Sequence, residues 1–194
     1  MSETVRTFVA IELPEEVRAY LADCQERLRR AGGDVKWVRP DLIHLTLVFL
    51  GEVPTEALAD LEKSVRDAAS GPVAMALRAG GAGRFPPRGL PRVIWIGIEE
   101  PSGKLLALQK ALADATAAFA EKAEDRAYQA HLTLGRVRGP KGARNLEGIL
   151  DSMSGQTGPT FEAREVTIFK SALGPQGPTY TVLLKVALSQ GGRP

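Results

Sequence analysis

Two histidines are the residues of this sequence whose type and surroundings point most directly to chemistry. His44 and His131 are the only histidines among the 194 residues, and each is followed by Leu-Thr-Leu. Side chains alternate between the two faces of a β-strand, so the histidine and threonine of each segment point to one side and the leucines to the other. The sequence therefore predicts two strands, each of which presents one imidazole and one hydroxyl over an apolar back.

Four such groups suit a reaction at phosphorus. Imidazole has an ordinary pKa of about 6.5, so one neutral and one protonated ring can coexist near neutral pH. One ring can take a proton from the attacking nucleophile while the other gives a proton to the leaving group, and in-line attack places these two on opposite sides of phosphorus. The hydroxyls of Thr46 and Thr133 can donate hydrogen bonds to the non-bridging oxygens. We therefore predict that His44 and His131 are catalytic and that Thr46 and Thr133 bind substrate.

The two segments belong to an internal repeat with an offset of 87 residues. At this offset residues 11–14 align with 98–101 and Gly71-Pro72 aligns with Gly158-Pro159, with no gap between the halves. We interpret the repeat as a duplication within a single bilobal domain of residues 1–194, with lobe-like repeats at approximately 6–79 and 92–172 and a terminal strand at 178–188. The alternative is two unrelated halves with ordinary strand and helix patterns.

Hydrophobic patterning predicts the element order β-α-β-β-α-β in each half. This order indicates an α+β fold class, with two pseudo-symmetric lobes whose antiparallel sheets surround a central cleft and whose helices lie on the outer faces. Residues 80–91, rich in glycine and proline, are expected to form a loop between the halves. We expect strands at 6–13, 35–38, 43–49, 73–79, 92–98, 130–137, 161–172 and 180–188, and helices at 14–30, 54–69, 101–120 and 144–151.

Composition narrows the class of protein. A net charge of +2 argues against a dedicated binder of duplex DNA, which needs many phosphate contacts, but it permits a small anionic site. Cys24 is the only cysteine, which excludes an intrachain disulfide and a cysteine-rich zinc site, and we expect it to be a small buried apolar residue. The N-terminal residues do not resemble a signal peptide, and no apolar run approaches the length of a membrane span. We expect a cytoplasmic protein without membrane association.

Other catalytic chemistries fit less well. Zinc usually takes three or four protein ligands with local spacing, whereas Asp41, the acidic residue near His44, aligns with Tyr128 in the second half. The Gly-x-Gly at residues 81–83 lacks the context of a phosphate-binding loop, and the sequence contains no Gly-x-Ser-x-Gly motif. We predict that the protein uses no metal and no other cofactor.

Four segments resemble a known superfamily. They are RTFVAIELP at residues 6–14, the segment from Trp37 through HLTLVFLG to Gly51, FPPRGLPRVIWIGI at residues 85–98, and AHLTLGR at residues 130–136. They are similar to the two-histidine (HxTx) phosphoesterase superfamily, and most closely to its bacterial RNA 2′,3′-cyclic phosphodiesterase branch, also called 2′-5′ RNA ligase. The resemblance covers nearly the whole chain. It implies a bilobal α+β fold, metal-free hydrolysis of a 2′,3′-cyclic phosphate to a 2′-phosphate, and the reverse ligation to a 5′-hydroxyl.

The resemblance also implies roles for individual residues. His44 would protonate the departing 3′ oxygen and His131 would activate water. The family has an arginine shortly after the second motif, which matches Arg136 and would contact the phosphate. Simple alternation places Arg136 on the apolar face, so it can bind substrate only if the strand bulges or ends near Gly135. The aligned residue in the first half is Phe49, so this charge breaks the repeat symmetry, as an asymmetric substrate requires.

The expected partners are RNA ends or small nucleotides that bear a cyclic phosphate, and we expect the chain to be a monomer. Two alternatives stay open: a phosphodiesterase that acts on 2′-5′ oligonucleotides or another small cyclic phosphate, and a non-catalytic RNA-binding module. Basic residues that could guide an RNA backbone are Arg84, Arg88, Arg92, Arg138, Lys141 and Arg144, and aromatic residues that could stack on a base are Trp37, Phe85, Tyr128 and Phe169.

Overall fold

The computed structural model describes residues 3–71, 73–122, 126–139, 143–175 and 177–189. Within these ranges the chain has an α+β fold with two antiparallel sheets and four α-helices, as predicted. The strands are β1 (Thr4–Ile11), β2 (Val35–Trp37), β3 (Leu45–Pro54), β4 (Met75–Phe85), β5 (Val93–Glu99), β6 (His131–Val137), β7 (Thr157–Ala163), β8 (Glu165–Gly174) and β9 (Gly177–Ala187). The helices are α1 (Glu15–Arg30), α2 (Leu58–Ala69), α3 (Lys104–Thr116) and α4 (Ala143–Met153), with 3₁₀ turns η1 (Pro40–Leu42), η2 (Thr55–Ala57) and η3 (Ala117–Phe119).

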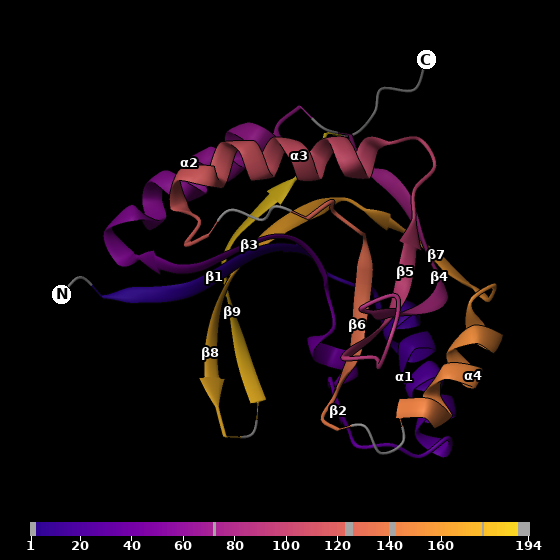
Figure 1. The fold of residues 1–194 in the computed structure, drawn as a ribbon. Coiled ribbons are helices and arrows are strands. Elements are labelled where there is room, and N and C mark those ends of the chain that lie inside the picture. The colour runs from indigo at the N-terminus through magenta and orange to yellow at the C-terminus, as the bar shows by residue number, and fades with distance from the viewer. Residues whose placement is uncertain (1–2, 72, 123–125, 140–142, 176, 190–194) are drawn as a thin grey trace.

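The two sheets and their helices form two lobes. The first sheet has the strand order β3-β1-β8-β9 and the second β2-β6-β5-β4-β7, and every pair of neighbours is antiparallel. Helices α2 and α3 lie side by side over the first sheet, whereas α1 and α4 lie beside the second (Figure 1). Among the described residues, each sheet therefore has one face covered by helices and one face without helices.

The repeats exchange elements between these lobes. At the offset of 87 residues, β1, β3 and β4 correspond to β5, β6 and β8. However, β4 pairs with β5 and β8 pairs with β1, and α1 packs against β7 while α3 packs against β3. The expectation of one lobe per repeat is therefore corrected, because each lobe contains strands and helices from both halves. The reason is that β4 pairs with the strand that follows it in the chain, which leaves an edge of β1 free for β8.

The apolar core lies between the helices and the covered faces of the sheets. The leucines of both His-Leu-Thr-Leu segments are buried in it, as their alternation predicts. One side of α1 enters the same core through Val17, Leu21, Cys24 and Leu28, which have helical spacing, so the prediction for Cys24 is confirmed. A second, smaller apolar cluster of Phe8, Ala10 and Phe169, with Tyr180 packed against it, is separate from this core.

Two element predictions were wrong. The first part of the expected loop at 80–91 is strand, because β4 continues to Phe85. Its glycines serve close packing rather than a turn: a Cβ on Gly80 would lie 2.7 Å from the Gln156 carbonyl oxygen, and one on Gly83 would overlap the Trp95 indole. The expected strand at 161–172 is two strands, β7 and β8, which belong to different sheets. In the described ranges, no helix is long and apolar enough to cross a membrane.

The exchange of elements makes each half dependent on the other. A chain of residues 1–91 contains β4 without β5 and β1 without β8, so we expect it to be unfolded alone, and likewise a chain of residues 92–194. The cut falls directly after the exposed connection at residues 86–90, so co-expression of the two fragments should restore the native circular dichroism spectrum and a cooperative thermal transition. Cooperative unfolding of residues 1–91 on their own would contradict this dependence.

Candidate active site

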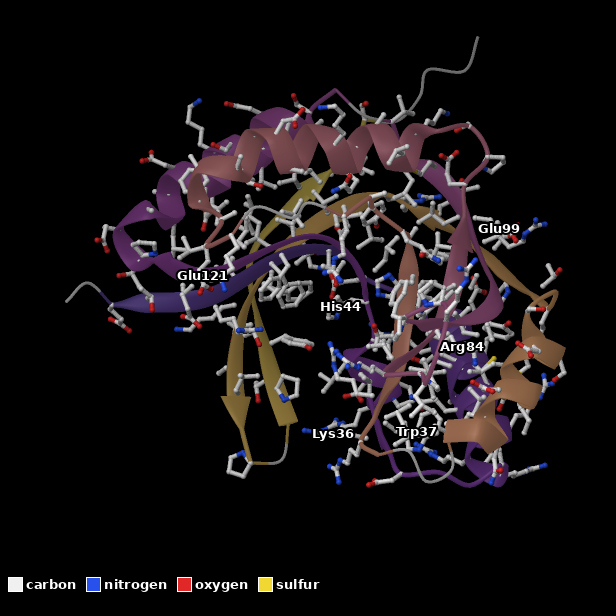
Figure 2. All side chains as sticks on the ribbon, viewed as in Figure 1. Lys36, Trp37, His44, Arg84, Glu99 and Glu121 are labelled. Carbon is white, nitrogen blue, oxygen red and sulfur yellow. The ribbon has the colours of Figure 1, made fainter. Side chains whose placement is uncertain are left out.

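The two His-Leu-Thr-Leu segments lie next to each other although they belong to different sheets. His44 immediately precedes β3, and His131 is the first residue of β6. Cα atoms of β3 and β6 come within 8 Å of each other, and the Tyr128 hydroxyl donates a hydrogen bond of 3.0 Å to the Thr46 carbonyl oxygen. Figure 2 shows His44 in the middle of the molecule, where the two lobes meet.

Both imidazoles are held in the same way. His44 Nδ1 lies 2.9 Å from the Leu42 carbonyl oxygen, and His131 Nδ1 lies 2.7 Å from the Gln129 carbonyl oxygen. A carbonyl oxygen only accepts, so each Nδ1 carries a hydrogen and donates it. In the neutral rings, Nε2 is therefore the nitrogen with the free lone pair, and it is the atom that can exchange a proton with a substrate.

Aromatic side chains hold each ring from the sides. The His44 ring stacks on Phe8 with 4.6 Å between centroids, and the Tyr180 ring lies nearly perpendicular to it with 5.2 Å between centroids. The centroid of the His131 ring lies 5.0 Å from that of Phe85 and 6.2 Å from that of Trp95. These contacts restrict ring rotation, and they surround each imidazole with low-dielectric material.

Burial keeps both imidazoles neutral to lower pH than free histidine. It is the largest cause of the lowered pKa of His44, and the hydrogen bond to the Leu42 carbonyl oxygen partly opposes it. The pKa of His131 is also lowered, and burial is again the largest cause. The hydrogen bond to the Gln129 carbonyl oxygen opposes this shift, and the positive charge of Arg136 adds to it. A bound anionic phosphate would reverse these effects by favouring an imidazolium.

The two threonines lie on the same faces of their strands as the histidines. Thr46 is opposite Ala10 of the small apolar cluster, and Thr133 is opposite Trp95. Both threonines are half-buried, and neither hydroxyl makes a hydrogen bond within the part of the chain that the structure describes. Their hydroxyls can therefore donate to a substrate.

A β-bulge brings Arg136 to the His131 side of its strand. Trp95 pairs with Thr133 and Ile94 with Gly135, so Leu134 is an extra residue in β6. The bulge shifts the alternation by one residue and places Arg136 on the face of Thr133. The bulge that we required at this position is present. Strand β3 has the same irregularity at the equivalent residue, Leu47.

Arg136 connects the surroundings of the two histidines electrostatically. Its charge lowers the pKa of His131, and it also opposes the burial that raises the pKa of Tyr180. Tyr180 is the residue whose ring lies nearly perpendicular to that of His44. The charge of Arg6 also lowers the pKa of Tyr180, so cationic groups from both lobes lie around this aromatic ring.

Glutamines from the exchanged helices support the two bulges. Gln25 of α1 is buried, and its amide nitrogen donates to the Val38 and Leu134 carbonyl oxygens at 2.7 and 2.9 Å. Gln109 of α3 donates to the Leu47 carbonyl oxygen at 3.3 Å. Each helix therefore binds the bulged residue of the other repeat. Helix α1 binds Leu134, two residues before Arg136, and α3 binds Leu47, one residue after Thr46.

The sequence reasoning missed several of these groups. Arg6, Phe8, Trp95 and Tyr180 were not proposed, although Phe8 and Trp95 are both aromatic and align at the repeat offset of 87, which was a usable signal. Gln25 gave no such signal, because a polar residue in an amphipathic helix is usually exposed.

The proposed stacking residues have different surroundings. Phe85 contacts His131, and Phe169 stacks on Phe8 at 5.2 Å. The Tyr128 hydroxyl is engaged with the Thr46 carbonyl oxygen, and Trp37 lies under the guanidinium of Arg29 at 5.3 Å, on the side of α1.

The basic residues that we expected to guide an RNA backbone also differ in their surroundings. Arg84 forms an ion pair of 2.7 Å with Glu147 of α4, whereas Arg88, Arg92 and Arg138 are exposed. Lys141 and the side chain of Arg144 lie outside the described residues. Among the described residues, no three His, Cys, Asp or Glu side chains come together as possible metal ligands.

Comparison with known proteins agrees with this arrangement. The family described as "LigT like Phosphoesterase" matches residues 11–95 and again residues 96–180, as expected for a repeated sequence. Similar proteins include RNA 2′,3′-cyclic phosphodiesterases of Methanothermobacter thermautotrophicus (34% identity, 91% of this chain and 95% of the relative) and Thermus thermophilus (35% identity, 95% and 90%).

Solved structures with the same fold include one from Thermus thermophilus, with 31% identity and a TM-score of 0.80 over 96% of this chain and 100% of that chain. Another is LigT of Escherichia coli in complex with 3′-AMP, with 26% identity and a TM-score of 0.77 over 97% and 100%. The two-lobe fold with one His-Leu-Thr-Leu segment per repeat is thus that of a phosphoesterase. The chain belongs to the LigT-like phosphoesterase family.

Replacement of Gln25 tests its support of the bulge. We expect Gln25→Met, which keeps the volume and removes the donors, to lower the free energy of unfolding by about 1–3 kcal/mol, because the carbonyl oxygens of Val38 and Leu134 lose this donor. Urea denaturation measures the change. The matched control is Gln109→Met, whose longer bond and partial exposure predict a smaller loss. An equal or smaller loss for Gln25→Met would contradict the assignment.

Proposed function

We propose that this chain is an RNA 2′,3′-cyclic phosphodiesterase that uses His44 and His131 as its acid and base, without a metal. The observation that carries the proposal is the pair of imidazoles, each held through Nδ1, on two strands that approach each other across the lobes. The charge of Arg136, which acts on His131 and on the tyrosine beside His44, supports a single anionic site. The names of the relatives point to the same activity.

In the proposed reaction, His131 Nε2 takes a proton from water as the water oxygen forms a bond to phosphorus. The bond between phosphorus and the 3′ oxygen breaks, and His44 Nε2 gives its proton to that oxygen. The products are a 2′-phosphate and a free 3′-hydroxyl. The step leaves His131 protonated and His44 neutral, and proton exchange with the solvent restores the starting state of both rings. Each of these proton transfers contributes roughly a hundred- to ten-thousand-fold in rate.

Thr46, Thr133 and Arg136 complete the site in this proposal. The threonine hydroxyls donate hydrogen bonds to the non-bridging oxygens, and the guanidinium balances the negative charge that develops on them. The same groups run the reverse reaction, in which a 5′-hydroxyl replaces water and a 2′-5′ linkage forms. We propose that the enzyme acts as a cytoplasmic monomer on RNA ends or small nucleotides.

The proposed function predicts metal-independent turnover. The protein should hydrolyse a dinucleotide that ends in a 2′,3′-cyclic phosphate in excess EDTA, and phosphorus NMR should find the phosphate on the 2′ oxygen. His44→Ala and His131→Ala should each lose at least about a hundredfold in kcat while they keep the wild-type thermal transition.

The outcome separates the alternatives. Turnover of a linear 2′-5′ dinucleotide in preference to the cyclic phosphate would favour the first alternative substrate class. Binding of RNA with no turnover of either compound would favour a non-catalytic module and would refute the proposal.

The pH dependence of kcat/KM tests which histidine is the base. Activity should fall on the acid side as His131 becomes protonated and on the alkaline side as His44 loses its proton, with an optimum below about pH 6.5 because burial lowers both pKa values. Removal of a neighbouring cation raises the pKa of an imidazole, so Arg136→Met should move the acid limb to higher pH and leave the alkaline limb in place. A shift of the alkaline limb instead would assign the role of base to His44.

A further inference from the structure

Two cationic side chains lie directly opposite each other beside the proposed site. Lys36 of β2 pairs with Arg136 of β6 in the antiparallel ladder, and both residues are exposed. Like charges at directly opposed positions destabilise a sheet, because their Cβ atoms are only about 5 Å apart. Within the described residues, neither side chain forms an ion pair with a carboxylate that would offset this repulsion.

The register shows which way this pair points. The next pair along the ladder, Trp37 with Gly135, faces α1, because the Trp37 ring lies under Arg29 and would touch a Cβ on Gly135. Neighbouring residues of a strand point to opposite faces, so Lys36 and Arg136 face away from α1. Figure 2 shows Lys36 and Trp37 on opposite sides of this edge of the sheet. Lys36 therefore lies on the same face as Arg136 and Thr133.

We propose that Lys36 binds a second phosphate, the internucleotide phosphate next to the cyclic one, so that the site favours an oligonucleotide end over a single nucleotide. The inference rests on the proposed function, in which Arg136 binds the reacting phosphate. Lys36 lies one strand further from β5 than Arg136 does, a spacing of about 4.8 Å, and it extends the cationic surface away from His131. A lysine ammonium on a flexible stem suits an exposed phosphate, which it binds as a point charge.

The unfavourable charge pair becomes favourable when phosphates occupy the site. One anion near Arg136 and another near Lys36 would replace repulsion with two attractive contacts. A cyclic mononucleotide has a single phosphate and can satisfy only one of the two cations. A dinucleotide with the same cyclic end has a second phosphate and can satisfy both.

The test compares two substrates that differ by one phosphate. For wild-type protein and Lys36→Met, kcat/KM is measured with adenosine 2′,3′-cyclic phosphate and with a diadenosine dinucleotide that ends in a 2′,3′-cyclic phosphate. We expect the ratio of dinucleotide to mononucleotide kcat/KM to fall roughly two- to fivefold in Lys36→Met, as for the loss of one exposed ion pair. The slope of log kcat/KM against log salt concentration for the dinucleotide should become shallower by about 0.7.

A matched control and a binding measurement make the test decisive. Lys104→Met, an exposed lysine of α3 in the other lobe, should leave both the ratio and the slope unchanged. An unchanged ratio in Lys36→Met would overturn the proposal. If the wild-type protein turns over neither substrate, the proposed function fails. Calorimetric titration of the two compounds into both proteins would then decide the role of Lys36 separately, by the same ratio.

Discussion

The approach of β3 to β6 across the boundary between the two sheets is the constraint on which the rest of the site depends. Each of these strands brings one histidine and one threonine, and neither strand alone can flank a phosphorus atom on two sides. The Tyr128 hydroxyl, three residues before His131, contributes to this contact through its hydrogen bond to the Thr46 carbonyl oxygen. The proposed catalytic arrangement is therefore a property of the whole fold and not of either half.

The exchange of elements ties the two repeats to each other. Because β4 and α1 of the first repeat lie in the lobe of the second, and β8 and α3 of the second lie in the lobe of the first, the two repeats cannot separate without breaking strand pairs. The glutamine contacts use the same exchange, since Gln25 reaches Leu134 and Gln109 reaches Leu47. Bulges leave strand geometry locally irregular, and a buried side-chain donor fixes the carbonyl oxygen in one position.

The two halves of the site are similar in construction and different in charge. Both imidazoles donate through Nδ1 to the carbonyl oxygen two residues before them, and both lie among aromatic rings. Arg136 exists on one side only, and it lowers the pKa of His131 without an equivalent effect on His44. One asymmetric charge in a symmetric frame lowers the pKa of His131 through a cause that does not act on His44, as the proposed role of His131 as base requires.

The sequence by itself determined the local features of this protein. Alternation in the two His-Leu-Thr-Leu segments determined which side chains are buried, and the repeat offset revealed that the two segments are equivalent. The helix over residues 14–30 and the class of fold also followed from local patterns, because amphipathic periodicity and strand alternation are short-range properties.

Only the tertiary structure decided the strand pairing, the face on which Arg136 lies and the burial of Gln25, which local patterns do not determine. The pairing of β1 with β8 joins segments that lie far apart in the sequence, and the face on which Arg136 lies depends on one extra residue in a ladder. The burial of Gln25 depends on a partner 109 residues away in the sequence. Such outcomes arise because distant segments compete for the same hydrogen-bonding edges and the same core. The local sequence of a single strand or helix does not predict the result of that competition.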